Sequence, residues 1–112
     1  MDLREDTAGR ITILEVKGRV DSTTAPALGE KMNEFLATPQ RRLVLDLRQL
    51  EYISSAGFRV LLITNRATAE KQGKLALCGV TGEVRRLFEI GSFMEQFLIC
   101  QTQADGIGKL RQ

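Results

Sequence analysis

The sequence predicts a single α/β domain with a four- to five-stranded mixed, mainly parallel sheet flanked by helices. Two observations lead to this fold class. The chain has 112 residues, of which 43% are apolar and 27% charged, which is the size and composition of one ordinary globular domain. From residue 11 onward, short apolar runs alternate with segments of helical periodicity, as in a parallel sheet with crossover helices. We find no linker, repeat or low-complexity tract, so residues 1–112 are expected to form one domain.

Apolar and β-branched runs mark the predicted strands. The first long strand covers Ile11–Val16, and a shorter strand is expected before it, near Leu3, with a turn at Ala8-Gly9. The run Leu43–Leu47 (LVLDL) is almost continuously apolar between polar neighbours, which predicts a central strand covered on both faces. Two further strands are predicted over Leu75–Cys78 and Phe97–Cys100.

Apolar side chains that recur every three or four residues predict three helices, over about residues 23–37, 56–72 and 82–90. The first helix follows serine and threonine residues, whose side-chain oxygens favour a helix start, and it has Pro26 in its first turn. The second helix is expected to include Ile63 on its apolar side. The residues that we expect to be buried are Leu45, Leu47, Leu61, Leu62, Leu77, Val84 and Leu87.

Glycines mark the expected ends of two helices. Gly73 is expected to follow the second helix in the left-handed conformation that commonly ends a helix, and Gly91 is expected to end the third. The tail over residues 104–112 contains two glycines and is either a weak final helix or a partly frayed segment.

Charge and residue usage exclude several classes of function. The net charge is only +2, with Lys and Arg scattered among Asp and Glu, so neither a nucleic acid nor a membrane is expected as a partner. The chain has no histidine, which removes Ser-His and Cys-His nucleophile pairs and histidine metal sites. No glycine-rich phosphate loop is present. We therefore expect no cofactor and no metal.

The two cysteines indicate a compartment. Cys78 and Cys100 each lie in an apolar, strand-like run, which predicts buried free thiols. The N-terminus has no apolar leader segment, and no apolar stretch reaches transmembrane length. Two reduced thiols in such a chain predict a cytoplasmic protein.

The most informative segment is Tyr52–Arg59 (YISSAGFR), where a strand leads through two hydroxyls and two small residues into a helix. Free N–H groups at a helix start form a natural anion site. The plainest interpretation is that Ser54 or Ser55 is only a helix cap. A serine nucleophile is disfavoured because no glycine lies two residues before either serine and no histidine could activate it. Asp46 is predicted to cap the turn after its strand.

This segment resembles the phosphorylation motif of the STAS anti-sigma factor antagonists, commonly written Asp-Ser-Ser/Thr-Gly followed by an apolar residue. Ser54 falls at the Asp position, Ser55 at the phosphoacceptor, Ala56 at the second hydroxyl and Gly57 at the glycine. Other segments resemble the family in the same order and with similar spacing, so the resemblance implies a STAS-like fold over nearly the whole chain. These segments are Gly18–Asp21 (GRVD), Leu43–Leu47 and Gly79–Phe88.

The resemblance implies a phosphorylation-switched binding protein and no enzymatic activity. Such an antagonist binds an anti-sigma factor that is also a serine kinase of the GHKL type, and this binding releases the sigma factor. Phosphorylation of Ser55 would end the binding, and a PP2C-type phosphatase would reset it. Ser54 is the rival acceptor, because the acidic residue that often precedes the acceptor in the family is absent.

The expected partner surface combines two loops and a helix. The Asp21–Thr24 turn and the Tyr52–Gly57 corner should lie at the same end of a parallel sheet, where such folds present ligands, and Arg59 should point outward one turn into the helix. The residues predicted to contact the partner are Asp21, Ser22, Thr23, Thr24, Ser54, Ser55, Ala56, Gly57 and Arg59.

Two other functions compete with the antagonist. One is a STAS docking subunit of a transporter ATPase or another signalling complex, which would bind without being phosphorylated. The other is an enzyme that uses Ser55. In each case the chain is expected to be a monomer or a weak dimer.

Overall fold

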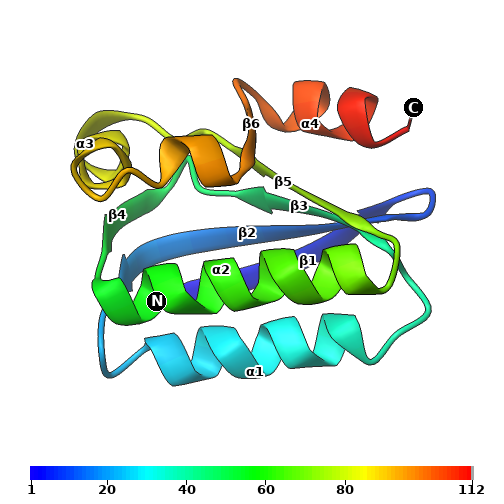
Figure 1. Ribbon diagram of the computed structural model, residues 1–112, viewed down its shortest axis with the longest axis horizontal. Helices are drawn as coiled ribbons and strands as arrows, with labels where there is room; N and C mark the ends of the chain where they lie inside the picture. Colours follow the sequence, from blue (N-terminus) through cyan, green and yellow to red (C-terminus); the bar gives the residue numbers. More distant parts are fainter. Residues whose placement is uncertain (112) are drawn as a thin grey trace.

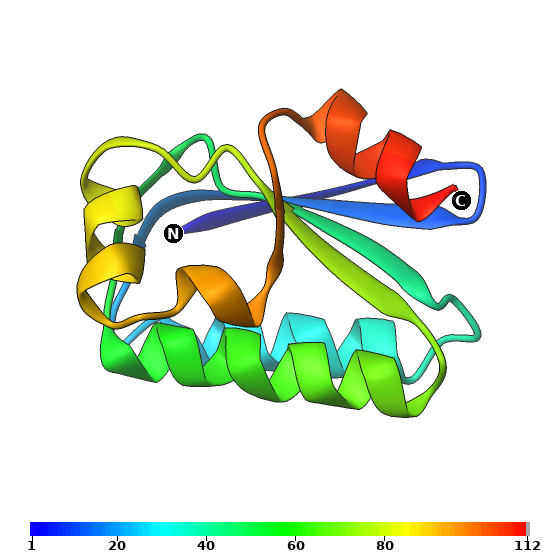
Figure 2. The ribbon, with the colours of Figure 1, turned by 45° about the horizontal axis from the view of Figure 1, so that its top comes forward.

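Helices cover both faces of a mixed six-stranded sheet in the computed structural model, which describes residues 1–111 (Figure 1). α1 and α2 lie side by side on one face, and α4 crosses the other face above β3 and β5 (Figure 2). α3 packs near β4 and closes one end of the main core. The strands are β1 (Asp2–Ala8), β2 (Ile11–Val20), β3 (Arg42–Asp46), β4 (Leu50–Ile53), β5 (Lys74–Cys78) and β6 (Leu98–Cys100). The helices are α1 (Ala25–Leu36), α2 (Ser55–Glu70), α3 (Gly82–Ile90) and α4 (Gln103–Leu110), with a short 3-10 helix, η1 (Met94–Gln96).

The sheet has the strand order β1-β2-β3-β5-β6, with β4 paired to the far part of β2. Only the β1–β2 pair is antiparallel, and the other pairs are parallel. The predicted class, a mainly parallel α/β sheet, is therefore confirmed. Because the strands run in the same direction from β2 onward, the loops that follow them gather at one edge of the sheet.

The predicted number of four to five strands is wrong, because β4 makes the sheet six-stranded and has no strand-like sequence pattern. In β4 the buried residues are Leu50 and Ile53, three positions apart, so the strand lacks the alternation that identifies a half-buried strand. β4 pairs only with β2, and this pairing carries β2 beyond the predicted end at Val16 to Val20. A register irregularity between Gly18 and Arg19 separates this part of β2 from the part that pairs with β3.

The central strands are apolar on both faces because each face has its own core. Leu43 and Leu45 of β3 belong to the large core beneath α1 and α2, whereas Val44 between them belongs to a smaller core beneath α4. β5 repeats the pattern, with Leu77 in the large core and Ala76 in the small one. This two-sided burial explains the continuous apolar run in LVLDL.

Five of the seven residues predicted to be buried are buried, while Leu62 and Leu87 are only partly covered at the edge of the core. On α2, Ile63 is 59% exposed instead of facing the core. The buried stripe of this helix continues through two threonines. Thr64 and Thr68 donate their hydroxyl protons to the backbone carbonyls of the residues four positions earlier, each at 2.7 Å, and so need no water.

The end of α2 differs from the prediction at Gly73. The residue with a positive φ is Gln72, at 62°, and not Gly73. Gly73 is needed for a different reason: a Cβ atom at this position would lie 2.0 Å from the carbonyl oxygen of Arg41. The loop into β5 therefore packs directly on the start of β3, where the backbone N–H of Lys74 donates to the same oxygen at 2.8 Å.

The tail forms a helix, which is the first of the two predicted alternatives. The hydroxyl of Thr102 accepts a hydrogen bond from the backbone N–H of Asp105 at 3.1 Å and so caps α4. Leu110 is 1% exposed and anchors this helix to the sheet. The last predicted tail residue, Gln112, lies outside the described residues.

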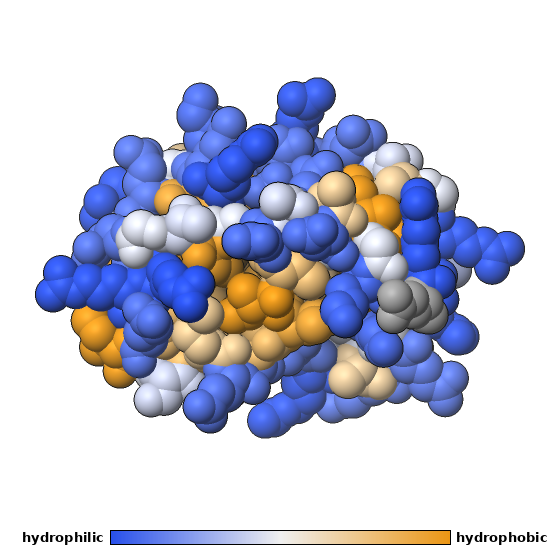
Figure 3. Space-filling view, turned by 90° about the horizontal axis from the view of Figure 1, so that it is seen from above, coloured by the Kyte–Doolittle hydropathy of each residue, from blue (hydrophilic) through white to orange (hydrophobic). Residues whose placement is uncertain are grey.

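The surface on the side of α3 and α4 is largely hydrophilic, with an apolar strip in its middle (Figure 3). The edge strand β6 lies on this side, and its Leu98 is one of three large apolar residues of residues 1–111 with exposed side chains. No helix within residues 1–111 is long and apolar enough to span a membrane.

The contact between Gly73 and Arg41 predicts a mutational effect. Gly73→Ala should lower the free energy of unfolding by about 1–3 kcal/mol, the usual cost of forcing an extra methyl group into a packed site. Gly108→Ala in α4 is the matched control, since nothing lies within 4 Å of its Cβ position and alanine favours a helix by up to about 1 kcal/mol. Urea unfolding followed by circular dichroism measures both variants. A Gly73→Ala midpoint equal to that of the wild type would contradict the packing argument.

Candidate functional site

The candidate site is a corner where the ends of β2 and β4 meet the start of α2 (Figure 1). Val20 and Ile53 are paired at the ends of these two strands. The backbone N–H of Ser54 donates to the carbonyl oxygen of Val20 at 2.8 Å, directly before the Asp21–Thr24 turn. The structure thus brings together the two loop segments that the sequence singled out.

The two serines at this corner have different environments. Ser54 is the N-cap of α2: its backbone is extended, with φ −88° and ψ 173°, and its Oγ accepts a hydrogen bond from the N–H of Gly57 at 3.3 Å. Ser55 is the first residue of the helix and is exposed, and its hydroxyl has no hydrogen-bond partner within residues 1–111. Ser54 is therefore occupied by a structural role, whereas the hydroxyl of Ser55 is open to another protein.

The surroundings of Ser55 can accommodate negative charge. The backbone N–H groups of Ser55 and Ala56 have no acceptor among the described residues, as is usual in the first turn of a helix. That turn carries no acidic side chain. Arg59 lies four residues after Ser55, on the same side of the helix, and is exposed. An oxyanion attached to Ser55 would therefore meet free amide donors and a nearby cation.

Gly57 lies beneath the corner and is buried. A Cβ atom on Gly57 would lie 2.7 Å from Cγ1 of Ile53 and 2.8 Å from Cγ1 of Val20. Its buried position is at odds with the predicted direct contact to a partner. The glycine instead lets the first turn of α2 rest on the β2–β4 pair, and it thereby positions Ser55. Ala56 is half-buried beside it.

The Asp21–Thr24 turn is held by its own hydrogen bonds. The Oδ1 atom of Asp21 accepts from the Thr23 hydroxyl and from the backbone N–H groups of Thr23 and Thr24, at 3.0 and 3.1 Å. These hydrogen bonds lower the pKa of the Asp21 carboxyl from 3.8 to about 2, and the bond from the Thr23 hydroxyl has the largest effect. The Thr24 hydroxyl donates to the carbonyl oxygen of Arg19 at 2.9 Å. Ser22 and Thr23 are the exposed residues of the turn, beside a carboxylate that stays ionised at neutral pH.

The exposed side of α2 extends the site beyond the predicted residues. A shallow hollow of about 310 Å³ lies along this side of the helix. In it, the exposed apolar side chain of Ile63 lies between arginines one turn before and one turn after it. The spacing of Arg59, Ile63 and Arg66 is the sequence signal for this side, and the prediction that Ile63 faces the core is wrong. The hollow is lined by Arg59, Leu62, Ile63, Arg66, Ala67 and Glu70.

Other reactive groups are committed to the structure. Asp46 caps the turn after β3, as predicted: its Oδ1 accepts from the N–H of Arg48 at 3.0 Å, and its Oδ2 accepts from the side chain of Gln103 at 3.0 Å. Cys78 and Cys100 are buried free thiols, as predicted. Burial, with the Asp46 carboxylate as a second cause, raises the pKa of the Cys78 thiol to about 12, and burial also raises the pKa of Cys100. Within residues 1–111, no group of three His, Cys, Asp or Glu side chains could hold a metal ion.

Comparison with known proteins identifies relatives over nearly the whole chain. The family described as the STAS domain matches residues 3–106. BtrV of Bordetella bronchiseptica, assigned as an anti-sigma factor antagonist, is 36% identical over 103 residues, which cover 92% of this chain and 89% of BtrV. The anti-sigma-F factor antagonist RsfB of Mycobacterium tuberculosis is 30% identical over 104 residues, covering 90% of this chain and 82% of RsfB.

A solved structure shares the fold. The crystal structure of an anti-sigma factor antagonist from Mycobacterium paratuberculosis superposes with a TM-score of 0.90 at 22% sequence identity. The superposition covers 99% of this chain and 94% of the other. The shared fold therefore includes the strands and the helix that form the corner.

The different environments of the two serines predict different effects on stability. Ser54→Ala should lower the free energy of unfolding by about 0.5–1 kcal/mol, because it removes the helix cap. Ser55→Ala, the matched control one residue away, should change it by less than about 0.5 kcal/mol, as expected for an exposed side chain without partners. Thermal or urea unfolding measures both. Equal losses for the two variants would mean that the cap assignment is wrong.

Proposed function

This chain belongs to the STAS domain family, and from that membership we propose that it acts as an anti-sigma factor antagonist of the cytoplasm. In this role it binds an anti-sigma factor and so releases a sigma factor. The main support for this proposal is the exposed hydroxyl of Ser55, which has no hydrogen bond within residues 1–111. It lies at the start of α2, beside the Asp21–Thr24 turn.

The proposed binding surface runs from this corner along α2. Ser22 and Thr23 offer exposed polar groups, and the ionised Asp21 adds a fixed negative charge. The exposed side of α2 adds positive charge and the apolar side chain of Ile63. Such a mixture of an apolar centre and charged surroundings suits a protein partner. The charges give the partner both a negative and a positive anchor, which favours one orientation.

Phosphorylation of Ser55 is the proposed switch. A phosphate adds roughly −1.5 to −2 charges at neutral pH. At the start of α2 the free N–H groups and Arg59 would stabilise it, the helix dipole alone by about 0.3–1 kcal/mol. The domain should therefore stay folded. In a close-packed protein interface, however, the same group introduces steric conflict and a desolvation cost, so the complex should dissociate.

The chemistry of this switch is assigned to the partners. We propose a serine kinase of the GHKL type, which is also the anti-sigma factor, and a PP2C-type phosphatase that resets Ser55. The chain itself is proposed not to be an enzyme. The absence of histidine and the raised pKa values of both thiols support this, because no histidine can activate a serine and burial disfavours both thiolates.

Incubation with the cognate kinase and ATP should place one phosphate on Ser55. Mass spectrometry of the peptide that contains both serines identifies the acceptor. Ser55→Ala should resist phosphorylation and still bind the anti-sigma factor, while Ser55→Asp should bind at least about tenfold more weakly, equivalent to about 1.4 kcal/mol. Phosphate on Ser54 alone would move the site by one residue. Phosphate on neither serine would favour the STAS docking subunit of a transporter ATPase or another signalling complex.

Arg59 tests the binding surface separately from the switch. Arg59→Glu should weaken anti-sigma factor binding by about 1–3 kcal/mol, because it reverses a charge on the proposed interface, and it should leave unfolding unchanged. Arg86→Glu on α3 is the control, since Arg86 is also exposed but lies on a different helix. Calorimetric titration of the two variants measures the difference. An equal loss of affinity in both variants would mean that the proposed surface is wrong.

A further inference from the structure

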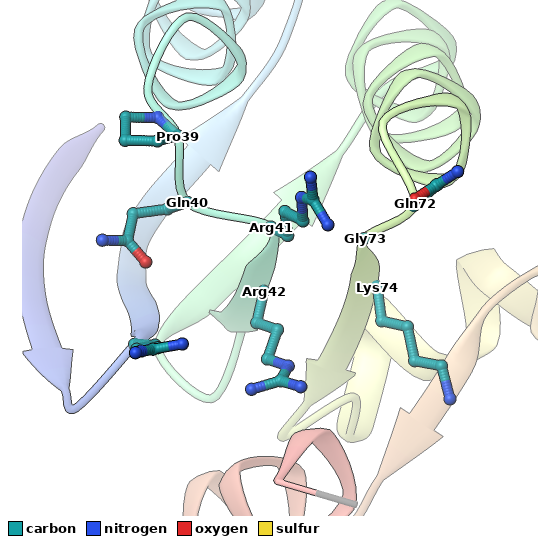
Figure 4. Close-up of a pocket in the computed structure, with 8 residues that line it drawn as sticks. Pro39, Gln40, Arg41, Arg42, Gln72, Gly73 and Lys74 are labelled. Carbon is teal, nitrogen blue, oxygen red and sulfur yellow. The ribbon is translucent and has the colours of Figure 1, made fainter.

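A positively charged hollow of about 410 Å³, shown in Figure 4, is formed by the loops at the starts of the strands. It is formed where β2, β3 and β5 begin, whereas the candidate site follows the end of β2. Three loops contribute to it: the β1–β2 turn, the α1–β3 loop and the α2–β5 loop. The hollow is lined by Arg10, Pro39, Gln40, Arg41, Arg42, Gln72, Gly73 and Lys74.

The sheet register brings two of these cations, Arg42 and Lys74, side by side. Arg42 is paired directly with Lys74 across the β3–β5 pair, and it is paired with Ile11, the residue after Arg10, across the β2–β3 pair. Neighbouring strands are only about 4.8 Å apart. Arg42 and Lys74 extend in the same direction from neighbouring strands (Figure 4). Like charges on neighbouring strands repel each other, and an anion between Arg42 and Lys74 would relieve this repulsion.

No protein group within residues 1–111 neutralises these cations. Within residues 1–111, the side chains of Arg10, Arg41, Arg42 and Lys74 form neither an ion pair nor a hydrogen bond. No residue that lines this hollow is acidic, and the acidic Glu70 lines an adjoining hollow together with Arg41.

The carbonyl groups at the end of α1 do not account for these cations either. Lys71, which does not line the hollow, already donates to the carbonyl oxygens of Leu36 and Thr38, at 3.1 and 2.8 Å. The four lining cations are therefore not needed to satisfy that helix end.

The backbone of the hollow is held rigidly. The absence of a Cβ atom at Gly73 lets the α2–β5 loop pack on the carbonyl group of Arg41, which also accepts the hydrogen bond from the N–H of Lys74. The positions of Arg42 and Lys74 are thus set by strand pairing and by this contact before any ligand arrives, which lowers the cost of ordering the site.

We infer that this hollow binds a free compound with several phosphate groups. Three of its four cations are arginines, whose planar guanidinium groups bind phosphate through paired hydrogen bonds. The side-chain amides of Gln40 and Gln72 can donate further bonds. The site is concave, and Pro39 is its only apolar side chain among the lining residues, which suits a small anion better than a lipid surface. The inference is independent of the proposed function.

Tripolyphosphate is the probe for this site. Two-dimensional NMR of the whole chain should show saturable amide shifts at Arg10, Arg41, Arg42, Gly73 and Lys74, with the Tyr52–Arg59 corner unaffected. The double variant R42Q/K74Q should bind at least about tenfold more weakly, because two charge-assisted contacts are lost. R85Q/R86Q is the control, since it removes the same charge from exposed positions on α3 and should bind as the wild type does.

Thermal unfolding gives a second measurement that does not depend on NMR. Without ligand, R42Q/K74Q should melt at the same temperature as the wild type or higher, because a repulsive pair is removed. With tripolyphosphate, the wild type should gain stability and the double variant should not. No saturable shift in the wild type, equal weakening in the control, or binding only to phosphatidylglycerol vesicles would overturn the inference. A large loss of stability in the unliganded double variant would do so too, since it would show that these cations stabilise the fold by themselves.

Discussion

The contact between Gly57 and the paired ends of β2 and β4 determines the geometry of the candidate site. Because Gly57 has no Cβ atom, the first turn of α2 rests directly on Val20 and Ile53. The hydrogen bond from the N–H of Ser54 to the carbonyl oxygen of Val20 then fixes where the helix begins. With the helix start fixed, the side chain of Ser54 turns back to cap the helix and Ser55 is exposed. A larger residue at position 57 would lift the helix from the strands, so a buried glycine without a polar side chain controls the exposure of a serine two residues away.

The parallel sheet separates two charged ends of the molecule. At the carboxyl ends of the strands, the corner presents the Ser55 hydroxyl, an ionised carboxylate and backbone amide groups without an acceptor within residues 1–111. At the amino ends, the starts of β3 and β5 bring Arg42 and Lys74 into register. Both ends depend on a glycine that permits close packing, Gly57 at one and Gly73 at the other. The two apolar cores lie between them, so a ligand at one end need not displace a partner at the other.

The fold could be predicted from the sequence where burial leaves a simple periodic signal. The run Leu43–Leu47 is apolar because both of its faces are covered. β4 gave no such signal because its buried residues are not alternate. The apolar pattern of α2 does not predict that Ile63 is exposed, because Thr64 and Thr68 are buried instead. Their hydroxyls donate to backbone carbonyls of the same helix. The position of the corner could be predicted, but the roles of its two serines could not, because only the backbone conformation at Ser54 distinguishes a cap from an exposed hydroxyl.

The corner is also suited to a change of surface without a change of fold. Asp21 already provides a negative charge at neutral pH, because the hydrogen bonds from Thr23 and Thr24 lower the pKa of its carboxyl to about 2. Ser55 adds a neutral group nearby, with Arg59 one turn further along α2. A phosphate on Ser55 would make this end strongly anionic and would draw Arg59 into a contact within the helix. Phosphorylation would then add a charge that the partner must desolvate, and it would also withdraw a cation that the partner could use. The hydrogen bonds that hold the Asp21–Thr24 turn and the cap of α2 would remain.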